Sequence, residues 1–145
     1  MSRLYKSEGE MSFTKIAFNV LTATFKIDVI FEIVDNPDDK SEFQSAIKPV
    51  NIHYKFFKSD YQMTGNEEKD VKESKKGKCI RAVTKNTDKR LRKITDYYFD
   101  NVLLIVVAEP ADGWDARYEN CVKTVSLKPG DTVNFTISLP KKYKH

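Results

Sequence analysis

The sequence contains very little of several residue types on which much protein chemistry depends. Its 145 residues include two cysteines, two histidines and one tryptophan. The two cysteines, Cys79 and Cys121, are too few and too far apart for a structural zinc site, which takes four ligands. They fit a disulfide in an oxidising compartment, and they fit two separate buried thiols equally well. We therefore expect no zinc centre, and the pairing of the cysteines stays open.

Long hydrophobic runs are also missing. No stretch approaches the roughly 20 apolar residues of a membrane-spanning helix, and residues 1–10 lack the hydrophobic core of a signal peptide. The net charge is only +4, from 25 basic and 21 acidic residues whose signs interleave along most of the chain. Such a distribution is typical of a solvated surface. The chain as given is therefore predicted to be soluble, with residues 1–10 polar and flexible.

Recognisable catalytic motifs are lacking too. His53 lies on the polar phase of a predicted strand and His145 is the last residue, so both are interpreted as solvated side chains and not as general bases. The sequence has no Gly-x-Ser-x-Gly elbow, no Walker-type loop and no His-Glu-x-x-His helix. One acidic loop lacks the ligand spacing and central glycine of an EF-hand; its carboxylates are Asp35, Asp38, Asp39 and Glu42. We expect no enzymatic activity, no cofactor and no metal.

The sequence does contain clear hydrophobic periodicity, and its period changes near Thr24. In residues 12–21 the apolar residues follow the spacing of a helix face, and Ser12 stands where an N-cap is expected. From Thr24 onward the period becomes two, which predicts a long strand with one buried face; its apolar phase is Phe25, Ile27, Val29, Phe31 and Ile33. A short amphipathic helix therefore leads into the first strand.

Further strands are predicted at residues 50–56, 79–84, 102–108, 118–127 and 132–139. Residues 94–99 are ambiguous, and a strand is favoured there by their apolar and aromatic side chains. The run from Val102 to Ala108 is continuously apolar, which indicates a central strand covered on both faces. Lys128-Pro129-Gly130-Asp131 has the pattern of a type II turn. Seven strands without a βαβ rhythm predict an all-β fold, an antiparallel two-sheet β-sandwich of the transthyretin or immunoglobulin type. Residues 11–145 are expected to form this single domain.

Three polar segments separate the predicted strands. Residues 36–48 form a loop too long for a simple connection, and such loops are often functional. Residues 64–78 contain one apolar residue, Val71, so they are predicted to be an exposed loop that does not pack. Residues 85–93 are the best nucleic-acid candidate, but they lack interleaved aromatics and are interpreted as a solvated face that binds no nucleic acid; their basic residues are Lys85, Lys89, Arg90, Arg92 and Lys93.

The order of these elements resembles the outer-membrane lipoprotein family of the bacterial type VI secretion membrane complex (TssJ). The resemblance covers about residues 15–140. It rests on short words in order: Met11-Ser12-Phe13-Thr14-Lys15 leading to Phe25-Lys26-Ile27-Asp28-Val29, then Asn36-Pro37, a strand from Pro49-Val50 to Phe56, Ala108-Glu109-Pro110, Trp114 and a closing hairpin. From the residues themselves, Trp114 is predicted to cover one end of the core.

The resemblance implies a transthyretin-like sandwich with an added N-terminal helical element and no catalytic role. It implies a protein anchored at the periplasmic face of the outer membrane, which holds the periplasmic C-terminal domain of the large inner-membrane component and oligomerises only within the complex. Members of the family carry an acylated cysteine at the mature N-terminus. This sequence has no cysteine near Met1, so the resemblance implies a soluble form from which the lipid-bearing residue has been removed.

An alternative function is a free-standing binding module, an inhibitor or effector that acts on another protein. A lipobox cysteine encoded upstream would support the secretion scaffold, whereas a natural start codon at Met1 would favour the alternative. In the family, the loop between the first two strands contacts the partner. The corresponding residues predicted to bind the partner here are Asn36, Asp38, Lys40, Phe43 and Ile47. The apolar pair Phe43 and Ile47 either tucks under the loop or docks into the partner.

Overall fold

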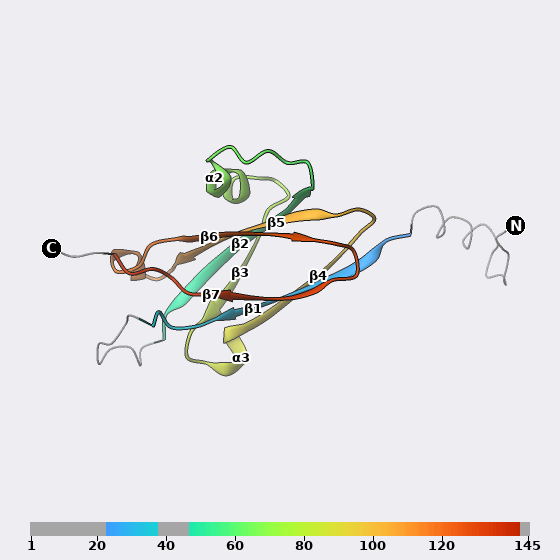
Figure 1. Cartoon of the computed structure of the whole chain (residues 1–145). Coiled ribbons are helices and arrows are strands. Elements are labelled where there is room, and N and C mark those ends of the chain that lie inside the picture. Colours follow the sequence, from blue (N-terminus) through green and yellow to red (C-terminus); the bar gives the residue numbers. More distant parts are fainter. Residues whose placement is uncertain (1–22, 38–46, 143–145) are drawn as a thin grey trace, which may run out of the picture.

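The computed structural model describes residues 23–37 and 47–142, which form two β-sheets packed face to face (Figure 1). The three-stranded sheet has the order β4-β1-β7 and the four-stranded sheet the order β3-β2-β5-β6. The predicted helix at 12–21 and residues 38–46 lie outside the described residues. The strands are β1 (Phe25–Ile33), β2 (Pro49–Lys58), β3 (Lys78–Val83), β4 (Leu91–Tyr98), β5 (Val102–Pro110), β6 (Cys121–Leu127) and β7 (Thr132–Ile137).

The core lies between the sheets and is built from the predicted alternation. Ile27, Val29, Phe31 and Ile33 of β1 are fully or almost fully buried, which confirms the inward phase of that strand. Phe31 contacts the ring of Tyr54 in the facing sheet, with centroids 5.9 Å apart. Phe25 was expected in the same buried row but is 60% exposed, because it lies at the edge of the sandwich, before the facing strands cover it.

The prediction of a purely antiparallel sandwich is wrong at one strand pair. β1 and β7 run parallel, with Phe31 opposite Phe135. The reason is that β6 and β7 are joined by a tight turn but pair in different sheets, so the expected closing hairpin forms no ladder. The turn itself is as predicted: Gly130 has φ +98°, and the Asp131 amide donates to the Lys128 carbonyl at 3.0 Å.

The prediction that residues 64–78 do not pack is also wrong. Helix α2 (Glu67–Lys72) lies on the outer face of the four-stranded sheet (Figure 1), and Val71 is 1% exposed in a cluster with Ile105 and Val107 of β5. Val71 is the only apolar residue of the segment, and it lies on the face of α2 that meets β5. Gly77 follows the helix closely, since an added Cβ there would run into the Val71 carbonyl oxygen. One apolar residue is therefore enough to dock this segment.

The connections at the ends of the sheets are mostly as expected. The basic connector contains a four-residue helix, α3 (Thr87–Arg90), whose N-cap Asn86 accepts the Lys89 amide at 3.1 Å. β4 then begins at Leu91, which confirms a strand in a region where the sequence was ambiguous. Trp114, in the 3₁₀ turn η2 (Trp114–Ala116), is half-buried against the core, as predicted for a residue that covers its end.

Candidate functional site

The loop predicted to bind a partner leaves β1 and returns to β2 at one end of the sandwich. Of its predicted contact residues, the structure describes Asn36 and Ile47, while Asp38, Lys40 and Phe43 lie outside the described residues. The Asn36 side-chain amide donates to the Leu139 carbonyl at 2.9 Å and ties the start of the loop to the chain after β7. Ile47 is 52% exposed at the other end of the loop. One residue of the predicted pair thus presents its apolar side chain to solvent.

A partly buried ion pair lies at the base of the same loop. Lys48 follows Ile47, its side chain is 5% exposed, and its Nζ lies 3.1 Å from Oδ1 of Asp35. The Nζ of Lys85 lies 2.5 Å from the other oxygen of Asp35. The Lys48 Nζ also stands 5.3 Å from the centre of the Tyr118 ring, in cation–π contact. We call Asp35, Lys48, Lys85 and Tyr118 the loop base.

No local sequence pattern indicates the loop base. Asp35 stands in a run of turn formers, and Lys48 reads as one more solvated lysine before Pro49. Lys85 and Tyr118 come from distant parts of the chain, so no local pattern connects them. The space left among these side chains is about 10 Å³, at the lower limit for one water molecule. Within the described residues, the site therefore presents an outward surface supported by ion pairs and no cavity for a ligand.

Electrostatics at the loop base favour the ionised carboxylate. Burial by itself raises the pKa of Asp35, but the hydrogen bonds and charges of Lys85 and Lys48 outweigh it and hold this pKa below its ordinary value. An aspartate with a lowered folded-state pKa stabilises the fold above the unfolded-state pKa, and this contribution is lost as the pH falls toward the folded-state value.

We expect Asp35→Asn to change the pH dependence of unfolding. The variant should be less stable than the native chain at neutral pH and should lose less stability between about pH 5 and pH 2, because its side chain does not titrate. Urea denaturation at a series of pH values measures both effects. An unchanged slope in the acid range would show that Asp35 does not supply this dependence.

The basic connector does not present free charge as a group. Lys85 pairs with Asp35, Arg90 lies 3.9 Å from Glu32 and Lys93 lies 4.0 Å from Asp28. Arg92 donates to the Arg81 carbonyl, across the gap between β4 and β3. These contacts pair much of the positive charge of the connector with carboxylates in and next to β1. Little unpaired charge is therefore left there to attract a phosphate backbone.

The prediction that His53 is solvated is wrong. Its side chain is 18% exposed, and its Nε2 lies 2.7 Å from Oε1 of Glu109, whose Oε2 accepts from Lys72 of α2 at 2.6 Å. The outer face of β2 is polar because it meets this helix and not because it faces water. Three polar side chains thus tether α2 beside its single apolar contact.

Cys79 stands next to this group but does not complete a catalytic site. Its Sγ lies 3.9 Å from the same Nε2 that contacts Glu109, so the histidine has no second nitrogen placed to relay a proton as in a triad. Burial raises the pKa of Cys79, whereas a nucleophilic cysteine has a lowered one. Both cysteines are free thiols, on β3 and β6 at opposite edges of their sheet. Within the described ranges, no group of three or more potential ligands is placed to hold a metal.

Comparisons with known proteins include a match to a solved structure. No protein-family model matches the chain, and neither does any curated protein. The chain is similar in structure to Serratia marcescens Lip. That protein is described as a membrane bound component of the Type VI Secretion System. The match covers 84% of this chain and 99% of Lip, with 11% sequence identity and a TM-score of 0.38.

Lip belongs to the same secretion system as the family that the sequence resembles. At this identity and TM-score, the two structures differ too much for the function of one to predict that of the other. In the described part of the chain, no helix has the length and apolar character needed to cross a membrane.

Proposed function

We propose that this protein is a non-enzymatic structural component of a bacterial type VI secretion envelope complex, built on a transthyretin-like sandwich. It would be anchored to the outer membrane through a lipid and would hold the periplasmic C-terminal domain of the large inner-membrane component. The observation that carries the proposal is the loop between β1 and β2, which has a rigid base and an exposed apolar residue.

The physical case for this loop rests on preorganisation. Binding orders the groups at an interface, and a loop whose ends are already held loses less entropy when it docks. Asn36 and Lys48 hold the two ends of this loop through contacts with Leu139 and Asp35. Ile47 lies directly beside the buried Lys48, so its position is set by the core while its side chain stays accessible. An apolar side chain held in this way is suited to anchor a protein interface.

The order of elements gives the second line of support. Three of the words that carry the sequence resemblance lie at the ends of elements of this sandwich: Pro49-Val50 begins β2, Glu109-Pro110 ends β5, and Trp114 follows at the end of the core. Among the described residues, the most enclosed polar groups pair with one another, as Asp35 does with Lys48 and Glu109 with His53, and this pairing supports a structural role.

We expect the double variant Phe43→Ser/Ile47→Ser to lose binding to the periplasmic C-terminal domain of the inner-membrane component. Truncating an interface anchor costs about 2 kcal/mol, or about 30-fold in Kd. The melting temperature should stay nearly unchanged, because the Ile47 side chain is half exposed. Isothermal titration calorimetry of the purified pair, with thermal unfolding of the variant alone, measures both quantities.

Two controls make the result specific. Met63→Ser removes another exposed apolar side chain, 56% accessible and away from the loop, and should bind as the native chain does. Ile27→Ala should instead lower stability first, because Ile27 is fully buried. If the loop variant unfolds, its side chains belong to the core; if it folds and still binds, the contact lies elsewhere. Either result ends the loop proposal.

A further inference from the structure

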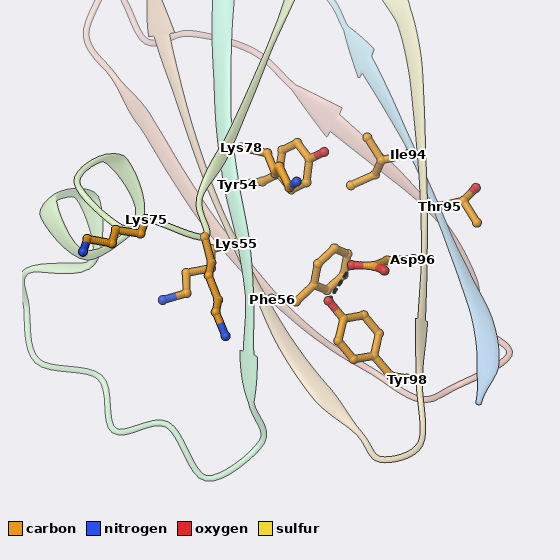
Figure 2. A pocket seen from close by; sticks show the side chains of 10 residues that line it. Tyr54, Lys55, Phe56, Lys75, Lys78, Ile94, Thr95, Asp96 and Tyr98 are labelled. Carbon is orange, nitrogen blue, oxygen red and sulfur yellow. Dashed lines mark hydrogen bonds between the residues drawn. The ribbon is translucent and has the colours of Figure 1, made fainter. Parts of the chain in front are cut away.

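The two sheets separate along the edge where β4 faces β2 and β3. A cleft of about 680 Å³ opens there, and Figure 2 shows Tyr54 and Phe56 of β2 facing Ile94, Asp96 and Tyr98 of β4. The rings of Phe56 and Tyr98 are 5.1 Å apart. They also border a second hollow of about 710 Å³, at the end of the sandwich. Phe56 and Tyr98 thus belong to the lining of both hollows. We call the cleft between β2 and β4 the groove.

The aromatic floor of the groove is neutral and its single carboxylate is already engaged. Asp96 accepts the Tyr98 hydroxyl at 2.7 Å and the Tyr97 amide at 2.9 Å. Burial, followed by the hydrogen bond to Asp96, raises the pKa of Tyr98, so its phenol keeps its proton. Apolar side chains of a ligand can therefore pack on the floor without meeting a bare charge.

The lining of the cleft also carries unpaired positive charge. Lys55 of β2 stands over the Phe57 ring, 4.6 Å from its centre. The other three lysines of the lining come from β3 and the turn before it: Lys75, Lys76 and Lys78. Among the described residues, none forms an ion pair with these three lysines, whereas Lys48, Lys72, Lys85 and Lys93 all have carboxylate partners. In the part of the chain that the structure describes, positive charge without a carboxylate partner thus lies beside the groove, whereas Lys85, Arg90 and Lys93 of the basic connector are paired with carboxylates.

β4 offers a backbone edge along the same groove. Within the described residues it pairs only with β1, so the other edge of this eight-residue strand has no strand partner. Exposed edges of this length readily accept another chain. At the α3 end, the contact from Arg92 to the Arg81 carbonyl closes the gap between β4 and β3. The open part therefore begins beyond that bridge and runs toward Tyr98.

We propose that this groove binds an extended acidic segment of a partner protein, which adds to β4 as a further strand. Alternate side chains of the segment would pack on Tyr54, Phe56 and Tyr98, and its carboxylates would meet the three lysines, while the backbone hydrogen bonds to β4. Charge complementarity and the free edge together select a polypeptide over a compact anion. This inference is independent of the proposed function, because it uses a different face of the molecule and a different partner chemistry.

Selection from a library of random ten-residue peptides displayed on phage tests the proposal. At low salt we expect peptides that alternate apolar and acidic residues to be enriched, and a synthetic peptide of the enriched sequence to shift backbone amide NMR signals of β4. The variant Lys75→Gln/Lys76→Gln/Lys78→Gln should weaken binding of that peptide about tenfold in fluorescence anisotropy. A proline at the centre of the peptide should abolish binding, because it removes a backbone donor.

A matched control removes the same charge elsewhere. Lys89→Gln/Lys123→Gln/Lys128→Gln alters three lysines outside the groove and should change the affinity by less than about twofold. The proposal is overturned if no acidic peptide is enriched, if the groove variant binds like the control, or if the proline peptide binds as well as its parent. The proposal is also overturned if the native chain and the groove variant bind lipid vesicles equally well and neither of them binds a peptide. The loop variant Phe43→Ser/Ile47→Ser should leave peptide binding intact, so the two proposals fail separately.

Discussion

Replacing residues 64–77 with a short glycine-containing turn should destabilise the protein by at least about 3 kcal/mol, because it removes the cover of β5. Val71 is 1% exposed, and Ile105 and Val107 beneath it are equally buried. Full burial of one valine side chain contributes about 1.5–3 kcal/mol, and the deletion would also return surface of the two residues below it to water. Chemical denaturation followed by tryptophan fluorescence measures the loss.

Two point variants separate the helix from its single apolar contact. Val71→Ala should cost about 2 kcal/mol, whereas Lys69→Ala, on the exposed side of α2, should stay within about 0.5 kcal/mol. The polar tether from Lys72 to Glu109 remains in both variants. A deletion that costs less than about 1 kcal/mol would mean that α2 does not cover β5 in solution.

Local periodicity was enough to predict the strands of this fold. β1, β2 and β7 alternate clearly, and burial of Ile27, Ile52 and Ile137 follows that alternation. The turn at Gly130 was equally predictable, because a positive φ restricts the choice of residue. These features depend on neighbours a few residues apart, which is the range over which a sequence pattern carries information.

Sheet partners and coverings were much less predictable. The continuous apolar run of β5 correctly indicated cover on both faces, but the cover is the segment that its own composition suggested would not pack. The two facts are consistent only in three dimensions, where Val71 meets Ile105 and Val107. In the same way, the parallel pairing of β1 with β7 depends on which sheet β7 joins after the turn. Composition averages over a segment, whereas docking can depend on one side chain.

The candidate site was likewise predictable only in part. Its position between the first two strands stays a prediction from loop length and the family resemblance, and Ile47 is exposed as a docking residue requires. The loop base could not be predicted from the sequence, because Asp35, Lys48 and Lys85 are polar residues whose burial and pairing arise only in the packed sandwich. The lysines beside the groove were not singled out either, because the sequence does not show that they lack ion-pair partners among the described residues. The sequence shows how many charged residues there are, whereas the structure shows which of them form ion pairs.

The loop base should show strong coupling between Asp35 and Lys48. Asp35→Ala leaves the ammonium of Lys48, 5% exposed, without this carboxylate, and should cost about 3 kcal/mol, since removing one partner of a buried ion pair is strongly destabilising. Lys48→Met should cost less than about 1 kcal/mol, because an apolar isostere removes the buried charge and still packs on the Tyr118 ring. The Lys85 side chain is 35% exposed and can reach water when Asp35 is replaced.

The double variant Asp35→Ala/Lys48→Met should therefore recover about 2 kcal/mol relative to the sum of the single variants, as measured in a double-variant cycle by urea denaturation. Additive effects would show that the two side chains stabilise the end of the sandwich independently. Because the pair holds the return of the loop beside Ile47, Asp35→Ala should also weaken partner binding without altering a contact residue. Lys48→Met, which keeps the packing, should weaken it less. Partner binding that follows the stability of the loop base across these variants is the result expected of a preorganised loop.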